Sequence, residues 1–320
     1  MDKRYLARRV GQGVVVVWLA YTVTFIGIEL LPSDPITAYL TRITNGASVP
    51  ASTVDAIKSY YGYDKPAVVR YFSQLAGVLT GDLGYSLSDS KPVGQRIFEV
   101  IGPTLTLALS ALAVALVITF VVLLISATSA RTWLVAGTEQ LPAIFNSIPS
   151  FCLGILCIQF LSFRLGILPL YPGGSFVSEF VPALVLGIGV SAPICQVALK
   201  ALRDVQRQPF LTVARAKGLS RTKIFFNHIL KHAAASILTM VALVVGFLLT
   251  GAIVVEKVFG RTGIGSVLEK AVTDQDFALI QGFVVLVALA YVVLSLTVDL
   301  LYPVIDPRVR LAHRSVGSRR

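Results

Sequence analysis

Two histidines have the spacing in this chain that best suits a chemical role. His228 and His232 lie four residues apart, so on a helix they would share one face and could bind a metal ion. No glutamate follows His228 in a His-Glu-x-x-His pattern, and no third ligand is evident. We therefore interpret both histidines as part of a basic loop and predict no metal site.

Motifs for catalysis do not occur elsewhere in the sequence. It has no Gly-x-Ser-x-Gly nucleophile turn, no paired aspartates within an apolar segment, and no Gly-x-x-x-x-Gly-Lys-Ser/Thr loop for nucleotide phosphates. Gly260, Gly263 and Gly265 follow an apolar segment, which predicts a turn and not a dinucleotide site. An intramembrane enzyme is disfavoured, and any ATP hydrolysis that serves this chain is expected on a separate polypeptide.

The composition indicates a helical membrane protein. Of 320 residues, 55% are hydrophobic and only 14% are charged, and the mean hydropathy is +0.77. The net charge of +11 could suggest nucleic acid, but the cations lie between apolar runs, as topology signals do. We predict no nucleic-acid partner. Cys152, Cys157 and Cys195 lie in apolar runs, where a thiol behaves as a small hydrophobe.

Six apolar segments are long enough to cross a hydrocarbon core of about 30 Å, which needs roughly 20 helical residues. Each must be helical because unpaired backbone groups are too costly in lipid. The first is too long for a cleaved leader and is interpreted as a retained signal anchor. The predicted spans are residues 10–31, 102–126, 138–163, 180–201, 236–258 and 278–303. Kinks in the third and fourth are expected at Pro142, Pro149, Pro182 and Pro193.

The distribution of cations predicts the orientation. The N-terminus, the 127–137 and 200–235 loops and the C-terminus together hold 18 of the 28 Lys and Arg residues. By the positive-inside rule, both termini and the 200–235 loop are cytoplasmic. The unusually long connection 32–101 is then extracytoplasmic. There, Ser52 or Thr53 can cap a helix to Tyr60, and Pro66 can open another that runs towards Gly77. This segment could receive a partner, gate a path or shield the first spans.

Polar side chains within spans are costly in lipid, so they are candidates for lining a translocation path. The amides are Asn146, Gln159, Gln196 and Gln281. Hydrogen bonding between helices is the alternative for each, and Asp299, near the end of the sixth span, could simply pair with a cation. With Asp299 as the only acid near a span's interior, an ion-coupled secondary transporter is disfavoured.

The loop between the fourth and fifth spans combines small and basic residues. A helix from about Val205 to Leu219 could end at Gly218, which tolerates a positive φ. It would present Ala214 and Gly218 on one face and leave room for another protein's surface. Cations that could meet acidic groups on that protein are Arg203, Arg207, Arg215 and Lys217. The alternative is a solvated basic loop that only fixes topology.

Five segments, in order, resemble the permease subunits of the peptide/nickel family of ATP-binding-cassette importers, on its dipeptide and oligopeptide side. They are Gly81–Ser86, Ser147–Phe151 with Leu165–Pro169, Thr212–Gly218, Glu256–Gly265 and Asp306–Arg310. The broad importer pattern has an acid where this chain has Thr212, and its proline downstream of the glycine is replaced near Ser236. These departures concern the detailed geometry of the loop.

The resemblance implies an all-α membrane protein with six transmembrane helices and the type I importer permease fold. Residues 1–31 would form the cytoplasmic N-terminus and first helix, and 32–101 the extracytoplasmic segment. Residues 102–303 would form a five-helix core with a coupling loop at 202–235, and 304–320 a cytoplasmic tail. The residues expected to couple to an ATPase are Thr212, Ala214, Arg215, Ala216, Lys217, Gly218 and Leu219.

The resemblance also implies a non-catalytic subunit of a bacterial plasma membrane that forms half of a path for dipeptides or oligopeptides. The implied partners are a second homologous permease, two ATP-binding-cassette ATPase domains, an external substrate-binding protein and membrane lipid. ATP and Mg²⁺ would bind to the ATPase subunits and no cofactor to this chain. Similar frames carry nickel or other small solutes, and a homodimer is the alternative to a second permease.

Overall fold

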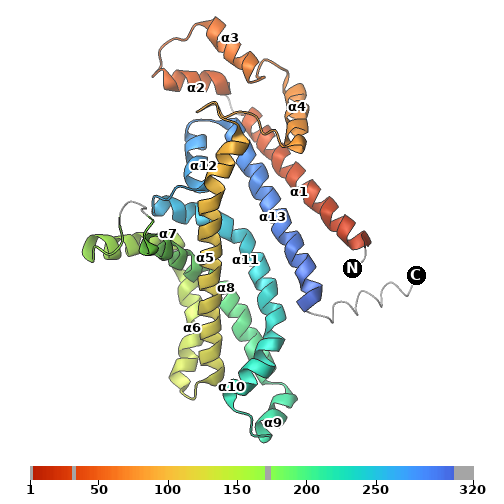
Figure 1. Ribbon diagram of the computed structural model, residues 1–320, viewed down its shortest axis with the longest axis vertical. Helices are drawn as coiled ribbons and strands as arrows, with labels where there is room; N and C mark the ends of the chain where they lie inside the picture. The colour runs from red at the N-terminus through yellow and green to blue at the C-terminus, as the bar shows by residue number, and fades with distance from the viewer. Residues whose placement is uncertain (1–2, 31–33, 170–173, 306–320) are drawn as a thin grey trace. The chain divides into compact units, whose positions relative to one another are not determined.

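The computed structural model describes residues 3–30, 34–169 and 174–305, and its regular elements are helices (Figure 1). These residues form two compact units, one from Met1–Pro103 and Thr262–Val292, the other from Thr104–Arg261 and Val293–Arg320. Two long helices, α5 (Val93–Thr128) and α13 (Phe277–Ile305), contribute residues to both units. The all-helical fold class is therefore confirmed.

The first unit, unit 1, contains a long apolar helix and several short ones. They are α1 (Lys3–Glu29), α2 (Pro35–Ile43), α3 (Ala51–Tyr60), α4 (Ala67–Thr80) and α12 (Ile264–Thr273). Asp34 caps α2 by accepting from the Ile36 N–H. α4 ends at Gly81, whose φ of +86° favours glycine.

Short helices were predicted in the 32–101 segment, but the details differ. The residue before α3 is Pro50, with no side-chain cap, so the predicted Ser52 or Thr53 cap is wrong. A proline suits this position because it lacks an N–H and its fixed φ leads into a helix. Helices α2 and α12 were not predicted.

Aromatic side chains hold α1 against α4. The Tyr71 ring packs against Tyr21 and Phe25, with ring centroids 5.5 and 5.3 Å away. The Trp18 indole N–H donates to the Tyr71 hydroxyl at 3.0 Å, and the Tyr21 hydroxyl donates to the Tyr71 carbonyl at 3.2 Å. Because these rings bury large areas and keep polar tips satisfied, they fix the short helices to a long one.

The second unit, unit 2, holds the remaining long helices. They are α6 (Thr132–Ser147), α7 (Ser150–Cys157), α8 (Phe176–Gln206), α9 (Pro209–Ala216), α10 (Arg221–Ile224) and α11 (Leu230–Val258). Two π-helical stretches, η1 (Ile158–Arg164) and η2 (Phe225–Ile229), extend α7 and join α10 to α11. One core lies among α5, α8 and α11, where small residues such as Ala111, Ala115 and Ala252 are fully buried and let the backbones approach.

Five helices are long and apolar enough to span a membrane, and a sixth span results if the bent pair Thr132–Ser147 and Ser150–Arg164 counts as one. The third predicted span, 138–163, corresponds to this pair, and the kink expected at Pro149 is confirmed as a bend of 91°. The break is at Ile148, which has an extended φ and ψ of −105° and 114°, just before Pro149. Proline removes a helical hydrogen bond and disfavours the helical conformation of the residue before it. Pro142, Pro182 and Pro193 lie inside continuous helices.

Candidate functional site

The predicted coupling segment is a short amphipathic helix, α9, that follows α8 directly. Pro209 occupies its first turn, where the missing N–H costs nothing. Leu211 and Ala214 are buried in a core with residues of α8 and α10, including Leu202 and Ile224. After α9, Gly218 takes a φ of +74°, and the Leu219 N–H donates to the Ala214 carbonyl.

Two features of the sequence-based prediction are corrected here. The single helix over 205–219 is wrong, because α8 continues to Gln206 and the chain turns before α9 begins at Pro209. The pairing of Ala214 and Gly218 on one open face is also wrong, since Ala214 is only 6% exposed and packs inside this chain. The left-handed conformation of Gly218 matches the prediction.

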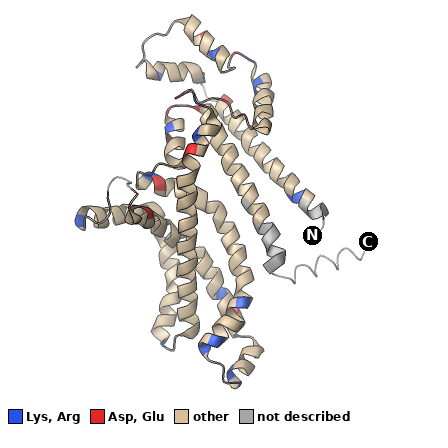
Figure 2. Ribbon diagram, viewed as in Figure 1, with Lys and Arg blue, Asp and Glu red and all other residues tan. Residues whose placement is uncertain are grey.

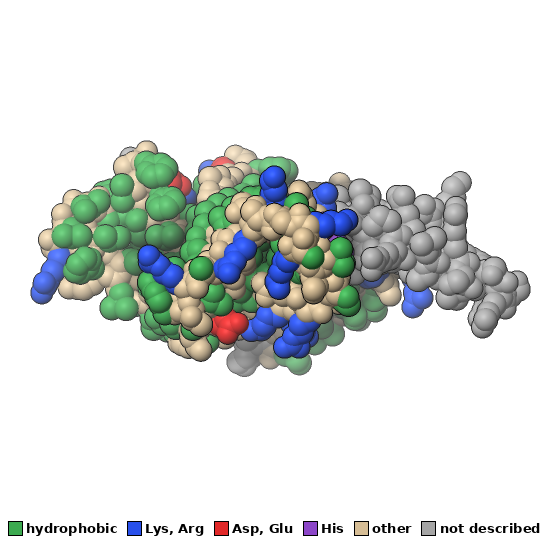
Figure 3. Space-filling view, turned by 90° about the horizontal axis from the view of Figure 1, so that it is seen from below, with side chains coloured by type: hydrophobic (Ala, Val, Ile, Leu, Met, Phe, Trp, Pro, Cys, Tyr) green, Lys and Arg blue, Asp and Glu red, His purple; other side chains and the backbone are tan. Residues whose placement is uncertain are grey.

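The remaining residues of the predicted coupling segment form a surface that we call the α9 surface. Thr212, Arg215, Ala216, Lys217 and Gly218 are exposed, and Leu219 is half-buried. From Arg207 to Lys231 the sequence has six cations and no acid. Figure 2 shows Lys and Arg positions along α9 and α10, and Figure 3 shows Lys and Arg side chains gathered on the face seen from below. This surface is suited to an acidic partner, and it is joined to the core of unit 2 through Leu211 and Ala214.

An aromatic contact joins α9 to η2 and to the start of α11. The Phe210 ring lies 5.9 Å from His228 and 5.3 Å from His232, centroid to centroid, and stacks on the second. The described residues contain no group of three or more side chains that could hold a metal ion. Both histidines pack on Phe210 in the structure, a contact that the sequence analysis missed.

The four candidate path amides are divided between the two units. Asn146 in α6, Gln159 in η1 and Gln196 in α8 belong to unit 2, and all three are exposed. Gln281 in α13 belongs to unit 1 and is half-buried. Asp299 lies in α13, but its side chain is outside the described residues. The alternative of hydrogen bonds between helices is not seen for the three exposed amides within the described chain, and their place along a path stays a prediction.

Buried charges that the sequence analysis did not single out lie in the segment 256–265. Glu256 is fully buried and its Oε1 accepts from the Thr104 hydroxyl at 2.5 Å, which joins α11 to α5. Arg261 is 6% exposed, donates to Glu179 Oε2 at 2.7 Å and to the Ser178 carbonyl at 3.3 Å, and so joins the end of α11 to the start of α8. A buried charge left without its partner is costly, so Glu256 and Arg261 link α11 to α5 and to the start of α8, although Glu179 is itself 47% exposed.

A second buried acid gives the Gly81–Ser86 segment its place in unit 1. Asp276 is fully buried at the start of α13. Its Oδ2 accepts from the Ser86 hydroxyl at 2.5 Å and the Ser88 N–H at 3.1 Å, while Oδ1 accepts from the Leu279 N–H at 3.2 Å. The carboxylate therefore caps a long apolar helix and anchors the turn that precedes α5.

Comparisons with known proteins identify the family. The model described as "Binding-protein-dependent transport system inner membrane component" matches residues 142–311, and the model of the N-terminal part of such components matches residues 2–108. The glutathione transport system permease protein GsiC of Pectobacterium atrosepticum is 31% identical over 306 residues, which cover 96% of this chain and 98% of that protein. GsiC of Escherichia coli K12 is 30% identical with the same coverage.

Solved structures show the same fold. Two crystal forms titled "Inward facing conformations of the MetNI methionine ABC transporter" align with TM-scores of 0.51 and 0.54, at 16% and 17% identity. They cover 66% and 65% of this chain and 96% and 95% of those chains. The chain therefore belongs to the family of binding-protein-dependent transport system inner membrane components, as a non-catalytic, multi-pass permease subunit of an ATP-binding-cassette importer, a type of transporter that implies separate ATPase subunits.

Proposed function

We propose that this permease carries short peptides, from dipeptides to oligopeptides and including glutathione, delivered by an extracytoplasmic binding protein. The observation that supports this cargo is the similarity to the glutathione permease GsiC, which extends over 306 residues and nearly the full length of both chains. The chain would form half of the path, with a second homologous permease forming the other half and two ATP-binding-cassette domains supplying energy.

The coupling step is proposed to run through the α9 surface. Its exposed Arg215 and Lys217 would meet acidic groups of an ATPase domain, and Ala216 would allow close approach. Because Leu211 and Ala214 share a core with α8, α10 and η2, a displacement of α9 would be transmitted to the ends of α8 and α11. Nucleotide binding in the ATPase pair would then bias the spans between two arrangements.

The cargo and the partners are tested together by purifying the tagged chain from its native cells in a mild detergent. We expect mass spectrometry to find a second six-span permease, ATPases with phosphate-binding loops and an external binding protein.

Uptake of radiolabelled glutathione and alanylalanine by cells lacking the chain's gene should then be compared with uptake of nickel. Loss of nickel uptake with unchanged peptide uptake would contradict the proposed cargo, and recovery of the chain alone from several detergents would contradict the proposed assembly.

The coupling role is tested by changing Ala216 to Trp. This exposed residue lies on the α9 surface, so a bulky ring should block ATPase docking and reduce ATP-driven uptake by at least tenfold while the protein still inserts. The matched control is Ala130→Trp, which puts the same ring at an exposed residue of the 127–137 loop. A Gly218→Trp change would be less specific, because its φ of +74° makes any side chain strained there. Normal uptake by an inserted Ala216→Trp protein would exclude this surface from coupling.

A further inference from the structure

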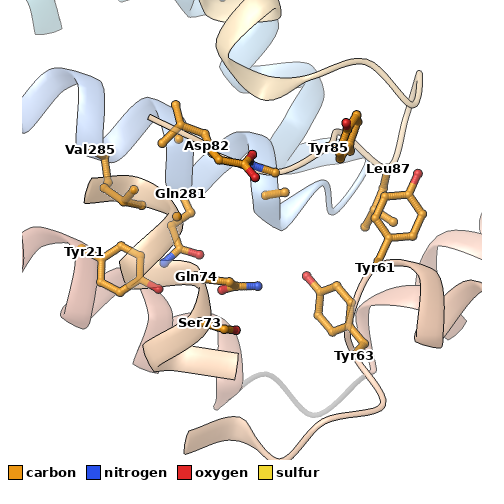
Figure 4. A pocket seen from close by; sticks show the side chains of 16 residues that line it. Tyr21, Tyr61, Tyr63, Ser73, Gln74, Asp82, Tyr85, Leu87, Gln281 and Val285 are labelled. Carbon is orange, nitrogen blue, oxygen red and sulfur yellow. Dashed lines mark hydrogen bonds between the residues drawn. The ribbon is translucent and has the colours of Figure 1, made fainter. Parts of the chain in front are cut away.

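Unit 1 contains a pocket that the transport proposal does not use. It has a volume of about 200 Å³ and lies among α1, α4, the 81–87 turn and α13, as Figure 4 shows. At roughly 30 Å³ for each water in the liquid, this is room for a small molecule of several heavy atoms. All of its lining residues belong to unit 1, so the pocket is complete within one compact part of the chain.

The lining has a distinctive chemical composition. Four tyrosines contribute to it, Tyr21, Tyr61, Tyr63 and Tyr85, together with the carboxylate of Asp82. No Lys, Arg or His is found among the described residues that line it. Aromatic faces attract cations, and sites lined by several rings recognise ammonium ligands. A carboxylate adds an opposite charge for such a cation. The pocket therefore favours a cation over an anion.

One buried donor in the pocket also lacks a partner. Gln281 Nε2 is shielded from solvent, and although it lies near the Tyr21 hydroxyl, it makes no hydrogen bond of acceptable geometry in the described chain. Figure 4 shows the Gln281 amide beside Gln74, within the ring of pocket side chains. A buried N–H left unpaired is costly, so a ligand that brings an acceptor oxygen to Nε2 would gain from it.

The neighbouring guanidinium does not cancel this preference. Arg70 stacks on the Tyr63 ring at 4.8 Å, but it does not line the pocket and is paired with Glu29. Burial raises the pKa of Tyr63 to about 12, so its hydroxyl stays protonated and neutral at physiological pH. Asp82 is then the only lining side chain that carries a full charge in the described pocket.

We propose that this pocket binds a primary ammonium group that has a carbonyl, carboxylate or phosphate oxygen a few bonds away. The ammonium would lie against the tyrosine rings and Asp82, and the oxygen would accept from Gln281 Nε2. Two sources supply this chemistry, the N-terminus of a small peptide and the ethanolamine headgroup of a phospholipid. The inference is independent of the α9 surface, so its failure would leave the proposed transport function standing.

The test uses the assembled transporter in nanodiscs made only of phosphatidylglycerol, without its binding protein. Binding of radiolabelled glycylglycine is measured by equilibrium dialysis, with hydrogen exchange of residues 77–87 to locate the site. We expect protection of this segment, and we expect N-acetylglycylglycine, which has no ammonium, to give none. Asp82→Asn and Gln281→Leu should each weaken the binding of glycylglycine about tenfold, the loss expected for one hydrogen bond to a charged or buried group.

Matched controls separate the pocket from the translocation path. Asp64→Asn changes an exposed acid of unit 1 that does not line the pocket, and Gln140→Leu changes an exposed amide of unit 2 outside the candidate path residues. Both should bind as the wild type does. In the wild type, the Gly84 N–H donates to Asp82 Oδ1 at 2.9 Å. Asparagine keeps an oxygen at this position, so Asp82→Asn should retain the turn. The test therefore does not depend on whether Gln281→Leu folds.

A second arm identifies the source of the ammonium group. If glycylglycine gives no protection but phosphatidylethanolamine in the nanodisc does, and Asp82→Asn removes it, the site is confirmed and its ligand is a lipid headgroup. If both ligands leave residues 77–87 unprotected, or if the acetylated peptide protects as well as glycylglycine, the proposal is overturned.

Discussion

At the residue scale, Asp276 shows how one buried acid supports two parts of unit 1. Replacing it by alanine would leave the Ser86 hydroxyl and the Leu279 N–H without this acceptor, while the Ser88 N–H would keep only its bond to Ser86 Oγ at 3.2 Å. Unsatisfied buried groups cost about 1–3 kcal/mol each. We therefore expect Asp276→Ala to lower the free energy of unfolding of unit 1 by about 2–4 kcal/mol and to speed hydrogen exchange in residues 81–92.

The control for this prediction lies two residues away. Asp274 pairs with Arg42 at 2.9 Å, but both side chains are partly exposed, at 20% and 46%. Such surface pairs contribute at most about 1 kcal/mol, so Asp274→Ala should have little effect on exchange in the same segment. Equal effects of the two changes would contradict the anchoring role of Asp276.

The cap of α2 gives a prediction about pH. Burial alone would raise the pKa of Asp34, but hydrogen bonds from Lys58 and Thr37 outweigh it and hold this pKa below its ordinary value. A lowered pKa means that the carboxylate stabilises the fold fully above the ordinary value for aspartate, and that this stabilisation is lost as the pH falls through the folded-state pKa. Proteolysis of residues 34–43 should therefore accelerate at acid pH below about 4. An Asp34→Asn protein should lack this acceleration, and an unchanged acid response would exclude Asp34 as its cause.

At the element scale, close helix packing in unit 2 depends on particular glycines of α8. A Cβ at Gly187 would lie 2.7 Å from Val114 Cγ1 and 2.9 Å from the Ala111 carbonyl oxygen, which belongs to the backbone of α5. A Cβ at Gly189 would meet nothing within 4 Å. Overpacking costs about 1–3 kcal/mol, so Gly187→Ala should lower thermal stability in detergent by several degrees.

The change of Gly189 to alanine is the control, because it alters helix propensity equally without the contact. We expect this protein to melt at or above the wild-type temperature, since alanine favours a helix over glycine. If Gly187→Ala were as stable as Gly189→Ala, α5 and α8 would have to separate at little cost, and the packing described here would be wrong.

The elements also show what could be predicted from the sequence. Long apolar segments identified most spans because lipid permits few other structures, and Gly218 was predicted at a helix end because few residues tolerate a positive φ. The kink at Pro149 was predicted but its sharpness was not, because proline within a span can either kink or interrupt it, and tertiary packing decides. Helix α12 was missed because the glycines at its start were interpreted only as a turn. The helix predicted from about Val205 was begun too early, because the end of α8 at Gln206 and the turn at Arg207 and Gln208 carry no glycine.

The candidate site was predictable only in part, for a similar reason. Composition identified the basic surface around α9, but it could not show that Ala214 faces inward, because that depends on partners from α8 and α10. Likewise, the pairing of Asp276 with Ser86 joins residues 190 positions apart, and no local pattern reports such a contact.

At the scale of the whole molecule, the asymmetry of charge should decide how the chain lies in the membrane. The 200–235 loop has eight of the 28 cations, and moving several lysines and arginines across a bilayer during insertion is disfavoured. We predict that Lys217 is cytoplasmic and Thr53 extracytoplasmic.

The measurement is labelling of single cysteines by a membrane-impermeant maleimide, in a background where Cys152, Cys157 and Cys195 are changed to alanine. Both positions are exposed in this chain, so each can react wherever no partner subunit covers it. Thr53→Cys should react in intact spheroplasts and Lys217→Cys only after permeabilisation, while detergent extracts, in which both react, provide the control. The reverse pattern would place the α9 surface outside the cell and would exclude its contact with a cytoplasmic ATPase.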